Sequence, residues 1–340
     1  MKTIVLEQPG AFSLRDTSAP ETPGQNEALV KIHRVGICGT DLHAFEGTQP
    51  FFSYPRILGH ELAVEIMALG EMDSVFDFKI GEICAVNPYL DCGNCISCRR
   101  GKPNACVNLQ VMGVHRDGGM REYITVPIRK LHRAGGLPVE QVALVEMLSI
   151  GAHATRRASL AAGDFVLVIG AGPIGMGTMQ FARLTGAKVI AMDVNEQRLA
   201  FCRDVLGIQH TVNATMNPLE DLKQLLGGDL PTTVFDATGN SKSMANAFQY
   251  VSHGGQLVYV GIVREDITFN DPFFHSHELT LFASRNATDD DFTWVINSLK
   301  TGEISLDGWI THRATPESLI IDFAGWLKPE TGVRKAMLTF

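Results

Sequence analysis

The spacing of hydrophobic and polar positions divides the 340-residue chain into two parts of different character. The first half carries short strand-like runs, rich in apolar and β-branched residues, that glycine and proline interrupt often. The clearest of these runs cover residues 28–35, 62–69 and 83–86. We therefore expect this part of the chain to be rich in β-structure.

From about residue 150 the pattern changes to short apolar runs that alternate with helical stretches. Residues 165–169 form an uninterrupted apolar run, as expected of a strand that is buried on both faces, and a helical stretch to about Leu184 follows. This alternation predicts a parallel sheet built from βαβ units. Further strands are predicted at residues 188–192, 233–237, 256–261, 279–283 and 335–340, and helices at 241–251 and near 289–300.

Composition excludes several classes of protein. Hydrophobic residues make up 45% of the chain and charged residues 19%, which excludes a largely disordered protein. No apolar run approaches the ~18 residues of a membrane span. The first residues lack the pattern of a signal peptide, so a cytoplasmic protein without a membrane partner is expected. The net charge of −8 argues against nucleic acid as a partner.

A glycine-rich turn follows the first strand of the second part. Gly170-Ala171-Gly172-Pro173-Ile174-Gly175 fits the pattern G-x-G-x-x-G between a predicted strand and a predicted helix. The first glycine permits the tight turn, the second the approach of a pyrophosphate, and the third close packing of helix and strand. The helix N-terminus then attracts the phosphates. In this context the motif predicts a Rossmann dinucleotide site, and a glycine-rich turn without a ligand is the alternative.

Asp193 ends the next predicted strand, eighteen residues after Gly175. An acidic side chain there accepts hydrogen bonds from the adenine ribose hydroxyls and repels a 2′-phosphate, which favours NAD over NADP. Arg198 weakens this preference, although its neighbours offer no basic pocket. Thr238 and Gly261, at the ends of two later strands, are further candidates for cofactor binding.

The cysteines form the second motif that points to a specific chemistry. There are seven, and this odd number, without a visible export signal, favours metal binding or catalysis over a disulfide scaffold. Cys92, Cys95, Cys98 and Cys106 offer four thiolates in one loop, which closes the coordination sphere of a tetrahedral structural zinc. An iron–sulfur run of the ferredoxin type would have three residues before its last cysteine and a proline after it, whereas this chain has seven residues and Val107. Two disulfides are the other alternative.

A second set of candidate metal ligands is spread along the first half. Cys38, His60 and Glu61 lie in turns at the ends of strand-like runs, and Glu146 lies in an otherwise apolar segment. A carboxylate is costly to bury there unless it is paired or holds a metal. One thiolate, one imidazole and one carboxylate would leave a fourth position open, as in a catalytic zinc site. Taken alone, each residue also fits a purely structural role: a cysteine packed in the core, a histidine in a satisfied polar contact, or a glutamate that caps a helix.

Together these stretches resemble the zinc-dependent medium-chain dehydrogenase/reductase family, and they occur in the family's order. The resemblance implies an α/β fold in which a Rossmann doubly wound parallel sheet is inserted in a β-rich GroES-like catalytic domain. It places residues 1–148 and 285–340 in the catalytic domain, with a structural zinc lobe at about 88–110, and residues 149–284 in the NAD-binding domain. A closer likeness to polyol and sugar-acid dehydrogenases rests on residues 49–56, 113–119, 284–288 and 338–340.

The family pattern also implies roles for single residues. Cys38, His60 and Glu146 would surround the catalytic zinc, with Glu61 beside it as an alternating or neighbouring ligand. Thr40 and His43 match the positions of a proton relay. Zinc is a Lewis acid that promotes loss of the alcohol proton while hydride passes to NAD. On resemblance alone, the candidates for the substrate pocket are Phe51, Tyr54, His115 and Arg285.

The expected activity is zinc-dependent oxidation of a secondary hydroxyl of a sugar acid, such as an L-galactonate-like aldonate, to a keto acid. Arg285 would pair with the carboxylate, although a surface or cofactor-phosphate arginine is an equal alternative. The other interpretations are a polyol (sorbitol-type) or other secondary-alcohol dehydrogenase, and a non-catalytic NAD-binding regulatory protein. The intact set of zinc ligands disfavours the last. Two zinc ions, NAD, a small-molecule substrate and further copies of the chain, in a homodimer or homotetramer, are the expected cofactors and partners.

Overall fold

The computed structural model describes residues 1–50 and 52–340, which divide into two compact units. Unit 1 contains Met1–Glu146, Thr288–Gly302 and Leu306–Phe340, and unit 2 contains Met147–Ala287 and Glu303–Ser305. The chain leaves unit 1 within helix α4 (Val145–Ala158) and returns to it just before α10 (Asp289–Lys300). Unit 1 is therefore built from three separate stretches of sequence.

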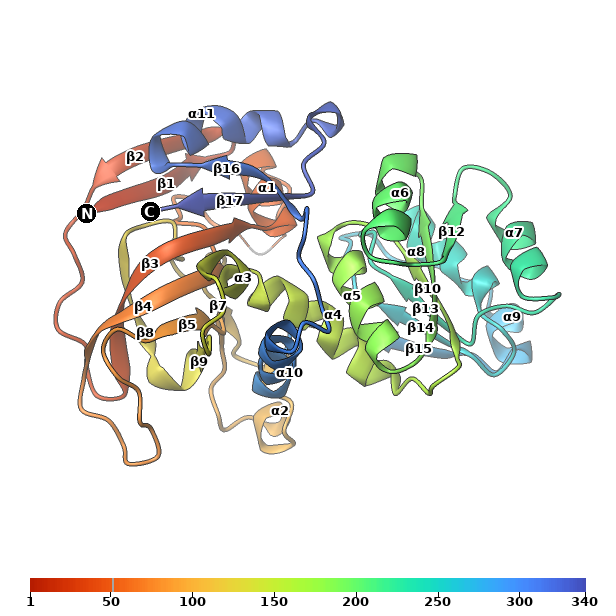
Figure 1. The fold of residues 1–340 in the computed structure, drawn as a ribbon, viewed down its shortest axis with the longest axis horizontal. Helices are drawn as coiled ribbons and strands as arrows, with labels where there is room; N and C mark the ends of the chain where they lie inside the picture. The colour runs from red at the N-terminus through yellow and green to blue at the C-terminus, as the bar shows by residue number, and fades with distance from the viewer. Residues whose placement is uncertain (51) are drawn as a thin grey trace. The chain divides into compact units, whose positions relative to one another are not determined.

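The main sheet of unit 1 has the strand order β16-β17-β3-β4-β5-β9, with β8 also paired to β3. Strand β3 (Glu27–Ile37) runs antiparallel to β4 (Glu61–Leu69), and Gly36 lies opposite Glu61. The C-terminal strand β17 (Lys335–Thr339) runs antiparallel to β3 on its other side, so the first and last parts of the sequence meet here (Figure 1). The other strands of this sheet are β5 (Ile83–Val86), β8 (Tyr123–Pro127), β9 (Leu131–Arg133) and β16 (Ile310–Ala314).

A hairpin and a helix cover part of this sheet. Strands β1 (Lys2–Gln8) and β2 (Ala11–Asp16) pair antiparallel, and α11 (Pro316–Trp326) contacts both of them and β16. Rings of Phe12, Phe45 and Phe323 meet here with centroids 4.9–5.3 Å apart, and their burial removes a large apolar area from water. The smaller elements are α1 (Gly39–Glu46), β6 (Tyr89–Leu90), α2 (Ile96–Arg99), η1 (Pro103–Ala105), β7 (Gln110–Val111), η2 (Ile128–Lys130), α3 (Val139–Ala143) and η4 (Pro329–Thr331).

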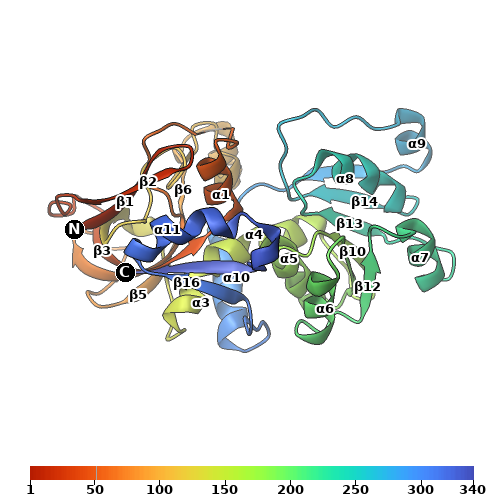
Figure 2. The same ribbon diagram turned by 90° about the horizontal axis from the view of Figure 1, so that it is seen from above.

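Unit 2 is a parallel sheet with the strand order β12-β11-β10-β13-β14-β15. The direction of strand addition reverses between β10 and β13, and right-handed connections then place helices on both faces. Figure 2 shows α5 and α6 on one side of the strands and α8 and α9 on the other. The bounds are β10 (Phe165–Ile169), α5 (Pro173–Leu184), β11 (Lys188–Asp193), α6 (Glu196–Asp204), β12 (His210–Asn213), α7 (Pro218–Leu225), β13 (Thr233–Asp236), α8 (Ser241–Asn246), η3 (Ala247–Tyr250), β14 (Gln256–Tyr259), α9 (Asp271–Ser276) and β15 (Thr280–Ala283).

The predicted α/β fold class, with its doubly wound parallel sheet and its β-rich part, is confirmed. The structure also contains elements that were not predicted, and two details of unit 2 show why. The helix predicted over residues 241–251 is α8 followed by the tighter turn η3, as is common where an α-helix ends. Strand β12 has the sequence His-Thr-Val-Asn and lies at the edge of the sheet, where only one of its residues is buried. It therefore lacks the apolar run from which the other strands of this sheet were predicted.

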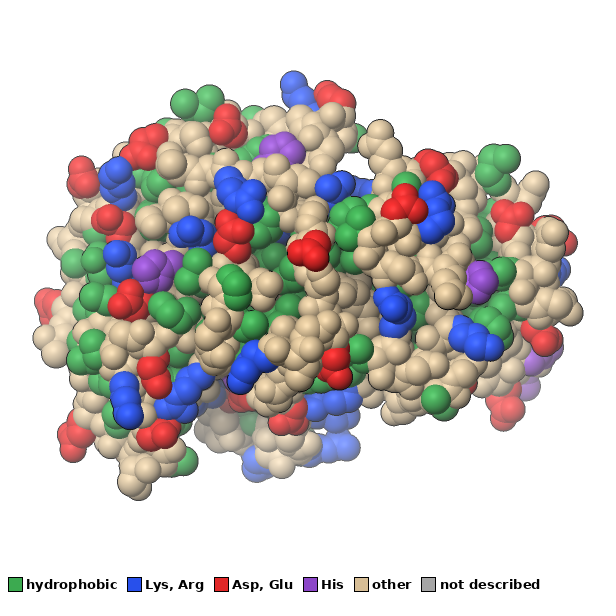
Figure 3. Space-filling model, in the orientation of Figure 1, with side chains coloured by type: hydrophobic (Ala, Val, Ile, Leu, Met, Phe, Trp, Pro, Cys, Tyr) green, Lys and Arg blue, Asp and Glu red, His purple; other side chains and the backbone are tan. Residues whose placement is uncertain are grey.

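One face of the molecule has mixed charge. Figure 3 shows basic and acidic side chains interspersed over the face that it draws. Within residues 1–50 and 52–340, no helix combines the length and the apolar character that a membrane crossing requires.

Candidate active site and metal centres

Cys38 stands where β3 ends and helix α1 begins. Its backbone N–H donates to Asp41 Oδ2 at 2.9 Å, and its side chain accepts from the Asp41 N–H, so the two residues form a capping box. Asp41 is buried, and this burial raises the pKa of its carboxyl. The local sequence Cys-Gly-Thr-Asp therefore fixes the Cys38 sulfur at the end of the sheet.

His60 and Glu61 lie at the start of β4, and both are buried. One ligand atom each of Cys38, His60 and Glu61 lies within 4.8 Å of the others. His60 Nδ1 lies 3.9 Å from Asp41 Oδ1, and the ring also hydrogen-bonds to Cys38. A carboxylate behind an imidazole is the arrangement that orients metal-binding histidines. The structure thus brings three of the predicted ligands together and adds Asp41, whose part the sequence analysis missed.

Glu61 has a buried cationic partner. Lys335 Nζ donates to Glu61 Oε1 at 2.6 Å and to the Ile37 carbonyl at 2.8 Å. A Cβ on Gly36 would lie only 2.0 Å from Glu61 Oε2, so glycine is required there to leave room for the carboxylate. Burial alone would lower the pKa of Lys335, but Glu61 and Cys38 raise it. Sequence analysis missed Lys335, and its signal is a lysine at the start of an apolar terminal strand.

Glu146 lies in the first turn of α4, and it is outside the group of atoms within 4.8 Å. Its Oε1 accepts a hydrogen bond from the hydroxyl of Tyr89 in β6. Both side chains are buried. Burial raises the pKa of Glu146 to about 7, and burial and the neighbouring Glu146 raise the pKa of Tyr89 well above its usual value. Tyr89 was not predicted, because nothing nearby in the sequence marks it.

The residues present fit a divalent cation. The carboxyls of Asp41, Glu61 and Glu146 are all buried near Cys38 and His60, and Lys335 contacts that of Glu61. Burial alone would lower the pKa of His60, but Cys38 and Asp41 raise it well above its usual value. A bound cation would stabilise the ionised form of these buried carboxyls. Sulfur, imidazole nitrogen and carboxylate oxygen are the donors that zinc prefers.

Thr40 and His43 lie three residues apart in α1, so their side chains share one face of the helix. Thr40 is half-buried and close in sequence to Cys38, whereas the His43 side chain is 63% exposed. His43 Nδ1 lies 3.4 Å from Thr48 Oγ1 and 3.5 Å from Glu46 Oε2. The exposure of the side chains thus increases from Thr40 to His43 along α1.

The predicted substrate residues fall in different places. The Tyr54 hydroxyl donates to the Ala44 carbonyl, and the Tyr54 ring packs on Phe52 with centroids 4.8 Å apart. His115 Nδ1 accepts from the Val111 N–H at 3.1 Å. Arg285 is exposed and follows β15 in unit 2. Phe51 lies outside the described residues.

The four clustered cysteines form a separate group in unit 1. Their sulfur atoms lie within 4.8 Å of one another, and three of the pairs are 3.4, 3.5 and 3.9 Å apart. All four cysteines are free, and tetrahedral zinc with bonds of about 2.3 Å would space its sulfurs about 3.8 Å apart. Backbone N–H groups of Cys98 and Val107 lower the pKa of Cys95 to about 6, which favours a thiolate at neutral pH. This group fits a closed zinc site.

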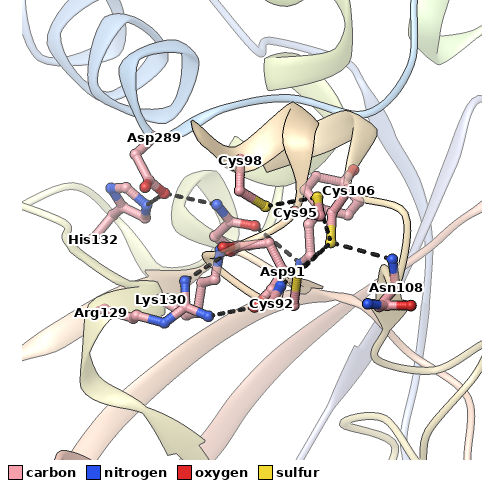
Figure 4. A network of polar contacts seen from close by, with 12 residues as sticks. Asp91, Cys92, Cys95, Cys98, Cys106, Asn108, Arg129, Lys130, His132 and Asp289 are labelled. Atoms are coloured by element: carbon pink, nitrogen blue, oxygen red, sulfur yellow. Dashed lines mark hydrogen bonds and ion pairs between the residues drawn. The ribbon is translucent and has the colours of Figure 1, made fainter. Parts of the chain in front are cut away.

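Two groups of polar contacts lie beside the loop that carries the four cysteines (Figure 4). Asp91 Oδ1 pairs with Arg129 and with the buried Lys130, each at 2.7 Å. Asp289, at the start of α10, pairs with His132 at 3.2 Å. Burial alone would raise the pKa of Asp289, but hydrogen bonds from His132 and Asn87 lower it to about 2. These contacts fix the segment that enters the lobe to the rest of unit 1.

The glycine motif of unit 2 has the geometry of a nucleotide-binding turn. Gly170 has a φ of +96°, and a Cβ on Gly175 would lie 1.7 Å from the Gly170 carbonyl oxygen. A Cβ on Gly172 would meet no atom within 4 Å, so the space beside it is open. Gly172 caps α5, and Pro173 and Ile174 form its first turn. Each glycine thus has the property that its predicted role requires.

Three of the other cofactor candidates, Asp193, Thr238 and Gly261, lie at the carboxyl ends of parallel strands. Asp193 Oδ2 accepts from the Ala171 N–H at 2.6 Å, which ties the end of β11 to the glycine turn. Arg198 is exposed in α6. Thr238 and Gly261 follow β13 and β14, and both bond to the buried Asp236, through its carboxylate and its carbonyl respectively. Sequence analysis missed Asp236, whose hydrogen bonds hold the segments that follow β13 and β14 in place.

Comparison with known proteins decides the family. The family model for the zinc-binding dehydrogenase domain matches residues 173–301, and that for the alcohol dehydrogenase GroES-like domain matches residues 24–136. The L-galactonate-5-dehydrogenase of Escherichia coli (strain K12) is 42% identical over 322 residues, covering 92% of this chain and 91% of that protein. The chain belongs to the zinc-dependent medium-chain dehydrogenase/reductase family.

Other members of the family cover the whole chain or most of it. The sorbitol dehydrogenase of Bacillus subtilis (strain 168) is 31% identical over 290 residues, covering 83% of this chain and 81% of its own. The crystal structure of the alcohol dehydrogenase RspB from E. coli CFT073 in complex with NADH is 31% identical, has a TM-score of 0.92, and covers 100% of this chain and 99% of its own. The protein is therefore an enzyme, an NAD-dependent zinc dehydrogenase that acts on a small-molecule substrate.

Proposed function

We propose that this enzyme oxidises a secondary hydroxyl of a sugar acid, an L-galactonate-like aldonate, to a keto acid, with NAD as hydride acceptor. The observation that carries the proposal is the group formed by Cys38, His60 and Glu61, which offers three zinc-type donors at the end of the sheet. The substrate class rests on the 42% identity to L-galactonate-5-dehydrogenase. In this assignment unit 1 is the catalytic domain and unit 2 the nucleotide-binding domain.

Cys38, His60 and a carboxylate of Glu61 or Glu146 would hold the catalytic zinc, and Cys92, Cys95, Cys98 and Cys106 the structural one. When bound, the catalytic zinc supplies Lewis acidity to the substrate oxygen. The hydroxyl proton leaves through Thr40 Oγ1 to His43 and then to solvent, which the exposure of His43 permits. NAD⁺, when bound, would accept the hydride from the same carbon, so that the alcohol is oxidised as NAD⁺ is reduced to NADH.

The cofactor is held by unit 2. The N–H groups at the start of α5 and the open space beside Gly172 suit the pyrophosphate, and Pro173, Ile174, Thr238 and Gly261 border the same strand ends. Asp193 suits the adenine ribose and disfavours a 2′-phosphate, so we propose NAD and not NADP. Arg198 is exposed and follows Asp193 by five positions, so it would be a candidate cation for a 2′-phosphate.

Specificity for an acid requires a cation near the substrate carboxylate. Arg285 is our candidate, with Tyr54 and His115 as further substrate-contacting residues. The test compares kcat/KM for NADH formation from L-galactonate and from the matching polyol, galactitol, in the wild type and in Arg285→Ala. We expect the aldonate to be preferred and Arg285→Ala to reduce the aldonate value about tenfold or more while galactitol changes little, as for a charge-assisted hydrogen bond. Equal loss with both substrates would remove Arg285 from this role.

A polyol dehydrogenase is the second candidate, favoured by the similarity to sorbitol dehydrogenase. A clear preference for galactitol or sorbitol over L-galactonate in the same assay would establish it.

We also propose that the enzyme is a homodimer or homotetramer. Strand β15 ends the order of the unit 2 sheet, and its Leu281 is exposed. An exposed edge strand with an apolar side chain favours pairing with another copy of the chain. Light scattering coupled to size-exclusion chromatography measures the mass directly, and a mass of one chain would contradict this assignment.

A further inference from the structure

Two buried carboxylates lie near Cys38 and His60, and each is held by a different kind of partner. Glu61 accepts from the Lys335 ammonium group, and Glu146 accepts from the Tyr89 hydroxyl. An ammonium group offsets the charge of the carboxylate that it contacts, whereas a hydroxyl orients a carboxylate and leaves its charge in place. The two carboxylates are therefore not equivalent toward a cation.

The backbone of Tyr89 is held on two sides. Strand β6 pairs with β7, so that Tyr89 lies opposite Val111, and the Tyr89 N–H donates to Asn87 Oδ1 at 3.0 Å. The Asn87 amide in turn donates to Asp289 Oδ1 at 2.7 Å. Because the chain on both sides of Tyr89 is fixed, its hydroxyl is aimed in a defined direction.

That direction is toward the candidate zinc ligands. The Tyr89 side chain is almost completely buried, and its hydroxyl bonds Glu146 Oε1. The charges of Cys38 and Glu61 also act on Tyr89, and the charge of Glu146 acts on His60. Tyr89, Glu146 and the group of Cys38, His60 and Glu61 therefore belong to one buried cluster within unit 1.

We propose that Tyr89 is a positioning residue that holds the Glu146 carboxylate in the orientation needed to bind the catalytic zinc. Lys335 meanwhile keeps Glu61 charge-compensated beside the zinc. This inference rests on the proposed function, because it requires zinc at Cys38 and His60. It assigns the two carboxylates different partners, the Tyr89 hydroxyl for Glu146 and the Lys335 ammonium group for Glu61.

The test measures zinc release from the intact enzyme and does not depend on turnover. Zinc-loaded wild type, Tyr89→Phe, Glu146→Ala and the double variant are titrated with a chelator of known affinity, and the zinc remaining per chain is counted by native mass spectrometry. Tyr259→Phe is the matched control, since it removes a hydroxyl that donates to the Met244 carbonyl at 2.6 Å in unit 2. The zinc of the four cysteines is an internal reference in every sample.

We expect Tyr89→Phe to weaken zinc binding at Cys38 about 10–100-fold, as removal of a group that orients a metal ligand does. The four-cysteine zinc and the Tyr259→Phe control should match the wild type. In the Glu146→Ala background, Tyr89→Phe should cause no further loss, because the two residues act as one unit. With Co²⁺ in place of the catalytic zinc, Tyr89→Phe should also shift the visible absorption bands that report ligand geometry.

Unchanged zinc affinity in Tyr89→Phe would overturn the proposal, and so would an equal loss with and without Glu146, because Tyr89 would then act through packing alone. Failure of the proposed function has a separate signature. In that case Cys38→Ser, in an otherwise wild-type chain, would retain both zinc ions, and this result would overturn both proposals at once.

Discussion

The two candidate metal centres of unit 1 are built in opposite ways. The four cysteines come from one stretch of fifteen residues, between β6 and β7, and need little beyond their own backbone to meet. Cys38, His60 and Glu61 meet only because β3 and β4 pair, and they depend on Asp41 and Lys335 for orientation and charge. A centre of four thiolates closes around its ion and stiffens a loop, whereas a mixed centre with supporting charges can leave a position for a substrate.

The largest effect should come from breaking the mixed centre at its sulfur. Cys38→Ser should lower the rate of NADH formation by about 10³-fold or more, because a Lewis-acid metal contributes several kcal/mol to the chemical step. Fluorescence titration should show that NADH binding persists, because the residues that we propose for cofactor binding lie in unit 2. Retained turnover in this variant would show that Cys38 does not hold the catalytic metal.

Breaking the closed centre should affect local structure more than turnover. Cys98→Ser should open the lobe, so that trypsin cleaves after the exposed Arg99, Arg100 and Lys102 at least about tenfold faster than in the wild type. The rate of NADH formation per uncleaved molecule should fall by less than about tenfold. Limited proteolysis followed by mass spectrometry measures the first effect, and trypsin resistance equal to that of the wild type would exclude a metal-dependent lobe.

Removal of the buried cation tests the supporting charge of the mixed centre. Lys335→Met should lower the free energy of unfolding by about 3–5 kcal/mol, because it leaves Glu61 buried without a counter-charge. Adding Glu61→Gln should recover part of this loss, since the uncompensated charge is then gone. Urea unfolding of the two variants measures both values. If the double variant were as unstable as Lys335→Met, the loss would come from packing and not from charge.

The smallest effect concerns the contacts at the base of the closed lobe. The pKa of Asp289 in the folded chain is about 2, below its usual value of 3.8. A carboxyl with a lowered pKa stabilises the fold above its usual pKa, and this contribution is lost as the pH falls from about 4 to 2. Because the side chain is half exposed, we expect less than about 1 kcal/mol. Asp289→Asn should therefore be slightly less stable than the wild type at pH 7. Its free energy of unfolding, measured with urea, should also fall less steeply between about pH 4 and pH 2.

The sequence predicted those features whose parts are close together along the chain. The spacing of the four cysteines and the glycine motif after β10 are examples, and the structure places both sets of residues as the spacing requires. The contacts that support the mixed centre were not predictable, since Lys335 lies 274 positions from Glu61 and Tyr89 lies 57 from Glu146. Asn87 and Asp289 are 202 positions apart. Such pairs arise only when the sheet and the returning C-terminal segment assemble.

The most direct test of the division between the two centres is stepwise removal of zinc from the wild-type enzyme, with zinc per chain and the rate of NADH formation from L-galactonate measured on the same samples. We predict two zinc ions per chain, and loss of activity in proportion to the first ion removed while the circular dichroism spectrum stays unchanged. Activity that persists after the first ion has left the Cys38 centre, or that falls only when the four-cysteine ion leaves, would contradict the assignment.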